Sequence, residues 1–145
     1  MASGAVSAAI EDHLTANWST TPMLFENKDT DESGNALPPA TPGYFVEVSF
    51  TGKTYGQQSI GAALQADNRW DEEGFLFFNV MIPRGDGSRT GRTYAKSLCD
   101  LFRGVTLLSG DLEFLDASIG EGEKGKYDGN YFMIPVDIEW RRVEA

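Results

Sequence analysis

Residues 74–104, GFLFFNVMIPRGDGSRTGRTYAKSLCDLFRG, join two contrasting patterns through a glycine-rich break. The first part, up to Ile82, is almost continuously apolar, which is typical of a central strand covered on both faces. After the break, apolar side chains recur at helical spacing and predict a helix over about 89–103, with Ser88 or Thr90 placed to cap its start. We expect this helix to cover the second face of the strand.

Upstream of this segment the chain shows one helical pattern and several strand-like ones. An apolar residue at every fourth position of 6–18 predicts an N-terminal helix that ends near its last residue. Residues 23–25 resemble a short strand, and the alternation over 44–50 predicts a strand with one strongly apolar face. Residues 55–66 indicate a weaker strand or irregular edge, and a turn is expected at Asp67-Asn68.

Downstream, residues 106–118 read as a strand or hairpin arm, and alternation over 132–141 predicts a closing strand. Pro135 within it indicates a sheet edge or a bulge. Together the elements predict an α+β fold: a mostly antiparallel sheet on which the two helices pack. One domain over 1–145 is expected, because this length is close to that of a typical single domain.

Three long exposed loops are expected, at about 29–42, 83–90 and 119–129. The first, DTDESGNALPPATP, combines acidic side chains with three prolines, so it has little to bury and cannot pair continuously. We therefore predict that it is exposed and mobile.

The composition excludes several classes of protein. Twelve basic against 22 acidic residues give a formal charge of -10, which opposes adhesion to nucleic acid or anionic lipid. No segment has the roughly 20 consecutive apolar residues of a membrane span, and no signal peptide is recognised. We predict no binding to free nucleic acid and no membrane association.

Residues suited to catalysis or metal binding are few. His13 is the only histidine and Cys99 the only cysteine, so neither a zinc site nor a catalytic triad is indicated. The loop from Asp29 begins like an EF-hand, but its twelfth position, which requires a carboxylate, is Ala40. We predict no enzyme activity, no cofactor and no metal.

The glycine-rich break carries Arg84, Arg89 and Arg92 ahead of a helix, a place suited to anions. The spacing matches neither dinucleotide- nor nucleotide-phosphate motifs. A flexible connector whose arginines meet acidic side chains of a neighbouring subunit is the simpler interpretation.

Runs of carboxylates are the remaining candidates for chemistry. They occur at 71–73 and at Glu121 and Glu123, in polar stretches bordered by glycine. Solvated charge is expected there, because no apolar pocket is indicated that would raise a pKa.

The layout of the chain resembles the tail terminator, or tail completion, proteins of long-tailed bacteriophages and gene transfer agents. The resemblance is carried by the N-terminal helix, by GYFVEVSF, by residues 74–104 and by NYFMIPVDIEWRRV. It implies a virion protein of the tail or neck, made in the host cytoplasm, that forms a hexameric ring. Such a ring caps the tail tube, contacts the tube and head-completion proteins, and lets DNA pass through its lumen without specific binding.

The sequence leaves two alternatives open: another neck or minor tail structural protein, and a small-molecule-binding or enzymatic α+β domain. For the interface we predict a role for the loop residues, not the core. The candidates are Arg84, Arg89 and Arg92 in the basic turn, and Asp29, Asp31 and Glu32 in the acidic loop.

Overall fold

The computed structural model describes residues 3–31, 33–57, 64, 70–120 and 125–144. Two helices, a single turn of 3-10 helix and seven strands follow one another along this part of the chain. In order they are α1 Gly4–Asn17, β1 Met23–Leu24, β2 Phe45–Gln57, β3 Trp70–Pro83, α2 Arg89–Phe102, β4 Thr106–Leu107, η2 Leu108–Gly110, β5 Leu112–Ile119, β6 Lys126–Asp128 and β7 Tyr131–Glu144.

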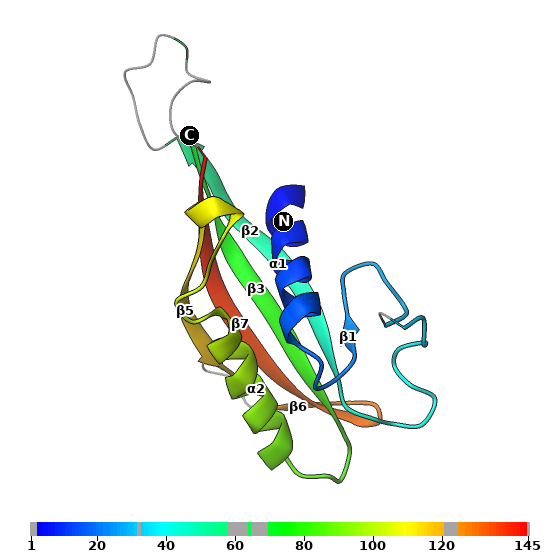
Figure 1. Ribbon diagram of the computed structural model, residues 1–145. Coiled ribbons are helices and arrows are strands. Elements are labelled where there is room, and N and C mark those ends of the chain that lie inside the picture. The colour runs from blue at the N-terminus through cyan, green and yellow to red at the C-terminus, as the bar shows by residue number, and fades with distance from the viewer. Residues whose placement is uncertain (1–2, 32, 58–63, 65–69, 121–124, 145) are drawn as a thin grey trace.

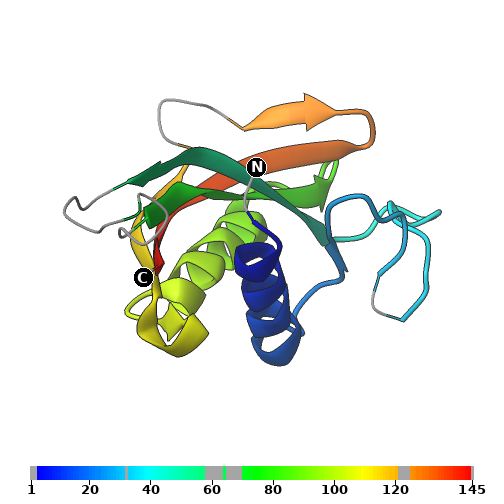
Figure 2. The same cartoon turned by 90° about the horizontal axis from the view of Figure 1, so that it is seen from above.

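The strands form one curled sheet in the order β1-β2-β3-β7-β5-β4, and β6 pairs with β7. Every pair is antiparallel except β1 with β2. Both helices lie on the same face of the sheet (Figures 1 and 2). The predicted α+β class, with two helices on a mostly antiparallel sheet, is confirmed.

The main core lies between this face and the two helices. Val6, Ile10 and Leu14 of α1 are fully buried, as their spacing predicts. In β3 and β7 alternate residues point into the core, and the register places Phe78 opposite Val136. Because burial of apolar surface is the main favourable contribution to folding, this layer holds the fold together.

The second face of β3 differs from the prediction, because α2 does not cover it. Phe75 and Phe77 on that face are only half-buried, and their rings stack 5.9 Å apart. Cover is found near the end of β3, where Met81 packs in a small second core with Leu37 from the long loop after β1. The continuous apolar run of β3 therefore reflects one covered face and one partly covered one.

The described residues of the long loop 29–42 are mostly exposed, but the loop is anchored at Leu37. Leu37 is buried against Phe45, Met81 and Tyr131. A single β-bridge between Thr30 and Ala36 narrows the loop into a hairpin-like tip. The burial of Leu37 could not be predicted from the composition of the loop, because Leu37 is one apolar side chain in a polar stretch.

The other two predicted loops are shorter than expected. α2 begins at Arg89, where the sequence predicts its start. Gly91 lies inside this helix and is therefore not part of the flexible connector expected between β3 and α2. A Cβ on Gly91 would come within 1.9 Å of the Ile82 side chain, so glycine here permits close packing of α2 on the sheet. In the third loop, residues 126–128 form β6, and residues 121–124, with Glu121 and Glu123, lie outside the described residues.

Two further strand predictions need adjustment. The region 106–118, predicted as one strand or hairpin arm, contains two strands joined by a tight turn: β4, the 3-10 turn η2 and most of β5. Pro135 lies where the outer edge of β7 passes from β6, paired up to Met133, to β5, paired from Val136. Its carbonyl accepts a hydrogen bond from the Gly120 N–H, so its missing N–H falls at a gap between strands.

The region 55–66 is described only in part: β2 continues to Gln57, while the predicted turn at Asp67-Asn68 lies outside the described residues. In the described part of the chain, neither helix has the length and apolar character needed to cross a bilayer.

Candidate interaction surfaces

The three arginines of the predicted basic turn all lie exposed at the start of α2 or just before it, but they are not equivalent. Arg84 lies over the ring of Tyr127, 4.3 Å from its centroid, and donates to the Gly129 carbonyl at 3.3 Å. Arg92 donates to the Ser88 hydroxyl at 3.3 Å, so Ser88 does not use that oxygen to cap the helix. Arg89 makes no ion pair with any described residue. It is thus the arginine most available to a partner.

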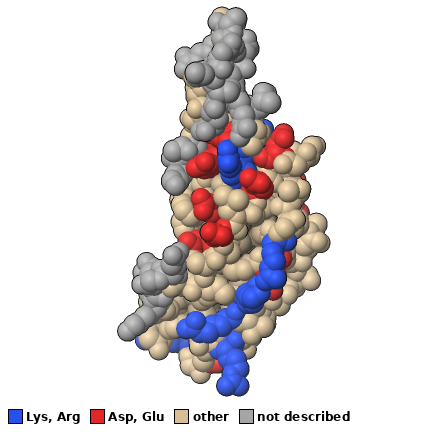
Figure 3. Space-filling model, turned by 90° about the vertical axis from the view of Figure 1, so that its left-hand side faces the viewer, with Lys and Arg blue, Asp and Glu red and all other residues tan. Residues whose placement is uncertain are grey.

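The basic surface extends along α2 beyond the predicted residues. Exposed side chains at Arg89, Arg92, Lys96 and Arg103 follow helical spacing, and we call them the basic band. Figure 3, which views the side on which α2 and β5 lie in Figure 1, shows a stripe of basic side chains in its lower half, and acidic side chains around further basic ones above it. The spacing of Lys96 and Arg103 from Arg89 was the signal that could have found them in the sequence.

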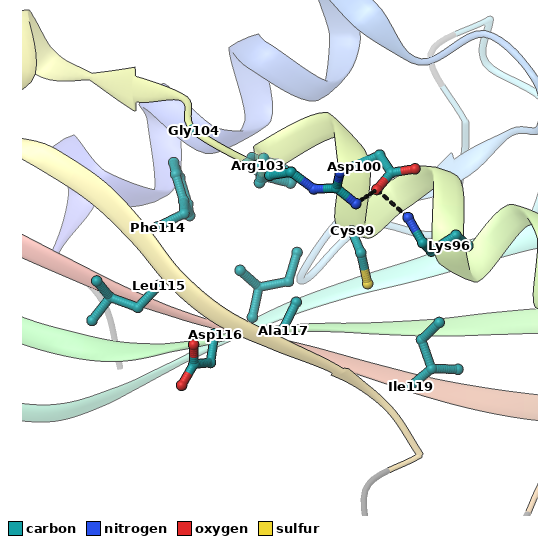
Figure 4. A pocket seen from close by; sticks show the side chains of 12 residues that line it. Lys96, Cys99, Asp100, Arg103, Gly104, Phe114, Leu115, Asp116, Ala117 and Ile119 are labelled. Carbon is teal, nitrogen blue, oxygen red and sulfur yellow. Dashed lines mark hydrogen bonds and ion pairs between the residues drawn. The ribbon is translucent and has the colours of Figure 1, made fainter.

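Asp100 interrupts the band. Its Oδ1 is 2.5 Å from Lys96 Nζ and 2.5 Å from Arg103 Nη2 (Figure 4). The hydrogen bond from Lys96 holds the pKa of the Asp100 carboxyl below its usual range. Because two cations share one carboxylate, this cluster keeps a net positive charge.

A groove of about 590 Å³ runs between α2 and β5. The side chains around it are shown in Figure 4: apolar walls come from Phe114, Leu115 and Ile119, and Cys99 projects from α2. Burial, and to a smaller extent the Asp100 carboxylate, raises the pKa of the Cys99 thiol. The thiol is therefore protonated near neutral pH, which does not favour a nucleophilic role.

The strand that forms one wall of this groove has an open edge. β4 pairs only with Leu112 and Glu113 of β5, and within the described residues no strand pairs the outer edge of 114–119. A bulge between Phe114 and Ala117 turns Leu115 outward, where its side chain is 47% exposed. Unpaired edges with exposed apolar residues are common sites of association.

The opposite side of the molecule is acidic. Asp29 and Glu26 are exposed, and a hollow of about 280 Å³ is lined by Glu11, Asp12 and Asp31, with Lys28 as its one basic side chain among the described residues. Figures 1 and 2 place α1 and the loop after β1 on the side away from β5. The basic band and this acidic hollow therefore lie on different sides of the molecule, although acidic side chains are also exposed on the α2 and β5 side.

The predicted acidic residues have different roles. Asp31 accepts hydrogen bonds from the backbone N–H groups of Ser33 and Asn35, both at 2.9 Å, so it shapes the tip of the loop. Asp29 is exposed and available for contact, whereas Glu32 lies outside the described residues. The structure does not bring the acidic loop and the arginines together within one molecule.

At 71–73 the expectation of solvated charge is wrong for Asp71 and Glu72, which are buried, whereas Glu73 is half-buried. The Asp71 side chain is fully buried, and its Oδ2 accepts hydrogen bonds from Arg141 Nε at 3.1 Å and Nη2 at 2.5 Å. Glu72 is also buried, with its Oε2 3.9 Å from Arg142 Nη1. The register of β3 with β7 brings these arginines to the acidic residues, a pairing that sequence separation conceals.

Glu72 also accepts hydrogen bonds from Ser3, the residue before the first turn of α1. Its Oε1 accepts a hydrogen bond from the Ser3 N–H at 2.6 Å, and its Oε2 accepts one from the Ser3 hydroxyl at 2.9 Å. A carboxylate at a helix N-terminus is favoured by the helix dipole and by the unpaired N–H groups there. These carboxylates therefore hold the fold together.

His13 joins the two helices. Its Nε2 lies 3.1 Å from the Leu101 carbonyl oxygen of α2, and its ring lies 5.1 Å from that of Phe102. These contacts give His13 a structural role between α1 and α2. Within the described residues no group of three or more His, Cys, Asp or Glu side chains is placed to hold a metal ion.

Comparisons with known proteins indicate the family and the fold of this chain. A family model described as phage tail terminator protein matches residues 5–140. A solved structure that carries no functional description matches with a TM-score of 0.65 and 22% identity, covering 100% of this chain and 97% of that one, which supports the fold alone. None of the curated proteins matches the chain.

Proposed function

This chain belongs to the phage tail terminator family and has a structural role in the tail, and we propose that it acts by closing a ring on the end of the tail tube. In this proposal six copies assemble head to tail, stop polymerisation of the tube protein and present a surface to the head-completion protein. Its place in the particle would be the junction of tail and neck.

The observation that carries the proposal is the placement of charge. The basic band lies on the α2 side of the subunit, with acidic side chains above it in Figure 3, and the hollow lined by Glu11, Asp12 and Asp31 lies on the α1 side, in a chain with a charge of -10. Complementary patches on opposite sides favour a heterologous contact, and such contacts generate a ring when the rotation between copies closes.

The same charge fits a passage for DNA. The 22 acidic residues exceed the 12 basic ones by ten, so a ring of several copies is strongly negative as a whole. Like-charge repulsion would allow DNA to pass the lumen without adhering. A lumen found neutral or basic in an image of the assembled ring would contradict this part of the proposal.

We also propose that the protein is not an enzyme. The groove between α2 and β5 contains charged groups, but Lys96, Asp100 and Arg103 pair with one another at its rim. Cys99, the nucleophile nearest to them, has a raised pKa. This arrangement is better suited to contact with another protein surface than to acid–base chemistry.

Tube assembly in vitro tests the function directly. Purified tail tube protein would be polymerised with and without this protein, and tube lengths and ends examined by negative-stain electron microscopy. We expect shorter tubes, each with an additional ring-shaped density at one end. Tubes of unchanged length with bare ends would contradict a terminator role for the protein in this reaction.

Charge reversal at Arg89 tests the ring. Arg89→Glu should abolish the closed oligomer in sedimentation velocity, while the melting temperature stays within about 2 °C, because exposed substitutions usually cost little stability. Arg89→Lys, which keeps the charge, is the matched control and should assemble normally. Normal assembly of Arg89→Glu would remove this residue from the interface.

A further inference from the structure

The face of the sheet turned away from the helices carries two aromatic side chains beside two carboxylates. Phe75 and Phe77 of β3 are half-buried there, and their phenyl groups stack 5.9 Å apart. The β3–β7 register places Glu139 opposite Phe75 and Asp137 opposite Phe77. Each phenyl group therefore has a carboxylate as its cross-strand neighbour. We call these four residues the aromatic–acidic patch.

The patch includes a small hollow. About 210 Å³ in volume, it lies beside Phe77 and is lined by Asn79, Pro135 and Asp137 among others. Both helices lie on the other side of the sheet (Figure 2), and the cover that Leu37 provides lies further along β3, at Met81. Pockets for drug-sized ligands measure about 300–1,000 Å³, so this hollow suits a single long side chain better than a small molecule.

The charge around the patch is acidic. Glu73 alternates with the buried residues of β3 as the two phenylalanines do, and Glu47 of β2 accepts a hydrogen bond from Asn79 Nδ2 at 3.5 Å. Among the described side chains that β2, β3 and β7 place on this face, Arg141 is the one basic group, and it is paired with Asp71. The complementary partner of the patch is therefore a basic surface.

The basic band on α2 has this chemistry. It comprises four basic side chains, whereas Asp100 is the one acidic residue within the helix. Arg89, which makes no ion pair with any described residue, is the most available of the four. A guanidinium can lie over a phenyl group and pair with a carboxylate at the same time, so arginine suits a site made of both. The exposed side of α2 and the outer face of the sheet lie on different sides of the subunit, so a second copy has to bring them together.

The acidic hollow beside α1 is the other surface that a basic band could meet. Its lining includes Lys28, whose charge opposes a basic partner. The aromatic–acidic patch offers phenyl groups as well as carboxylates, and the arginine near it, Arg141, is already engaged by Asp71. The patch is therefore the better match for the band.

We propose that the aromatic–acidic patch of one subunit binds the basic band of a second copy of this chain, with Arg89 directed at the patch. The inference rests on the proposed ring, for which it names the two contacting surfaces. Because the two surfaces differ and lie on different sides of the subunit, the contact is heterologous and can repeat from copy to copy until the ring closes.

Directed cross-linking tests the contact. In a Cys99→Ser background, one preparation carries Thr51→Cys and another carries Thr93→Cys, and both positions are exposed. Thr51 lies opposite Phe75 in the β2–β3 register, and Thr93 belongs to α2. The preparations are mixed at high salt, returned to low salt and treated with a short bifunctional thiol reagent. We expect a covalent dimer from this pair.

A second pair tests the competing surface. Thr15 is exposed on α1 and lines the acidic hollow, so Thr15→Cys is combined with Thr93→Cys in the same way. We expect much less covalent dimer from this pair. More dimer from it than from Thr51→Cys with Thr93→Cys would overturn the inference, because the band would then face the hollow.

Charge reversal provides an independent readout. Glu139→Lys should weaken association at least about tenfold in sedimentation velocity, because it sets like charges against each other. An equal mixture of Glu139→Lys and Arg89→Glu should associate more strongly than either variant alone, since the unchanged band of the first then meets the unchanged patch of the second. Asp111→Lys, which makes the same change of charge at an exposed site away from the patch, is the matched control and should associate like the wild type.

The outcomes separate this inference from the proposed function. A cross-link between positions 51 and 93, together with weaker association of Glu139→Lys, supports the contact. A closed oligomer that lacks this cross-link and is unaffected by Glu139→Lys overturns the inference and leaves the ring intact. Unchanged self-association of Glu139→Lys with loss of tube capping also overturns it, because the patch then faces the tube protein. A chain that stays monomeric under all conditions overturns both the contact and the ring.

Discussion

Two groups of charged residues in this protein use the same chemistry in opposite settings. At the start of β3, Asp71 is paired with Arg141 in the interior, with 0% of its side chain exposed. On the outer face of α2, Asp100 is shared by Lys96 and Arg103, with 46% of its side chain exposed. The first group joins strands that are about 70 residues apart in sequence, whereas the second joins neighbours within one helix.

The difference shows how burial divides charged residues between folding and assembly. A buried carboxylate has lost its water and needs its partner, so removing the partner is costly. An exposed ion pair contributes little to stability, and its members can exchange partners when another protein approaches. Structural charges therefore lie at the β3–β7 end of the sheet, and charges available for assembly lie on α2.

The largest expected effect comes from breaking the buried pair. Arg141→Ala should destabilise the protein by about 3 kcal/mol, because it leaves the Asp71 carboxylate buried without this partner. Chemical denaturation followed by circular dichroism measures the change. The double variant Asp71→Leu, Arg141→Met should be more stable than the single variant, and a loss below about 1 kcal/mol for Arg141→Ala would contradict the structural role.

A smaller effect is expected on the inner side of α2. Gly91→Ala should cost about 2 kcal/mol, because the added methyl group would overlap Ile82 and force the helix away from the sheet. Thr93→Ala, on the exposed side of the same helix, is the control. Gly104→Ala is unsuitable for this purpose, because Gly104 has a positive φ and alanine would be strained there. Equal melting temperatures for Gly91→Ala and Thr93→Ala would show that α2 packs less closely than described.

The hydrogen bonds between Glu72 and the start of α1 should contribute less to the free energy of unfolding than the packing at Gly91. Glu72→Gln keeps the shape of the side chain but removes the charge that faces the helix N-terminus and Arg142, and about 1 kcal/mol should be lost. Hydrogen exchange should show the loss mainly as faster exchange in the first turns of α1. Unchanged protection of those amides would mean that Glu72 does not hold the helix.

The smallest effect is expected for Asp100→Ala, whose melting temperature should stay within about 1 °C of the wild type. The lowered pKa of Asp100 means that its ionised form is favoured in the folded state. Its contribution is therefore present above the usual pKa of about 4 and is lost as the pH falls through the lowered folded value. A large difference between the two proteins at pH 7 would show that exposed charges on α2 are structural after all.

The sequence was a good guide wherever a feature depends on local periodicity. The four-residue spacing from Val6 to Trp18 and the alternation over 132–141 predicted α1 and β7, and the glycine-rich break located the start of α2. The exposure of Arg84, Arg89 and Arg92 could be predicted because they lie in or next to that glycine-rich break. These features depend on residues that are close together in sequence.

Features that depend on distant residues were not predictable in the same way. The burial of Asp71 and Glu72 requires Arg141 and Arg142, which only the β3–β7 register brings near. The cover of Met81 comes from Leu37, a single apolar residue in a polar loop. The groove likewise needs α2 and the bulged edge of β5 together, and no local pattern in either one indicates it.

Sedimentation velocity at increasing salt concentration tests the central claim, association through oppositely charged flanks, most directly. Wild-type protein and Arg89→Glu would be compared from low salt to about 1 M NaCl, where the Debye length falls to about 3 Å. We predict a closed oligomer of the wild type that dissociates progressively as salt rises, and a monomer of Arg89→Glu throughout. A wild-type oligomer that is insensitive both to salt and to this substitution, or a wild-type monomer at every salt concentration, would contradict the account.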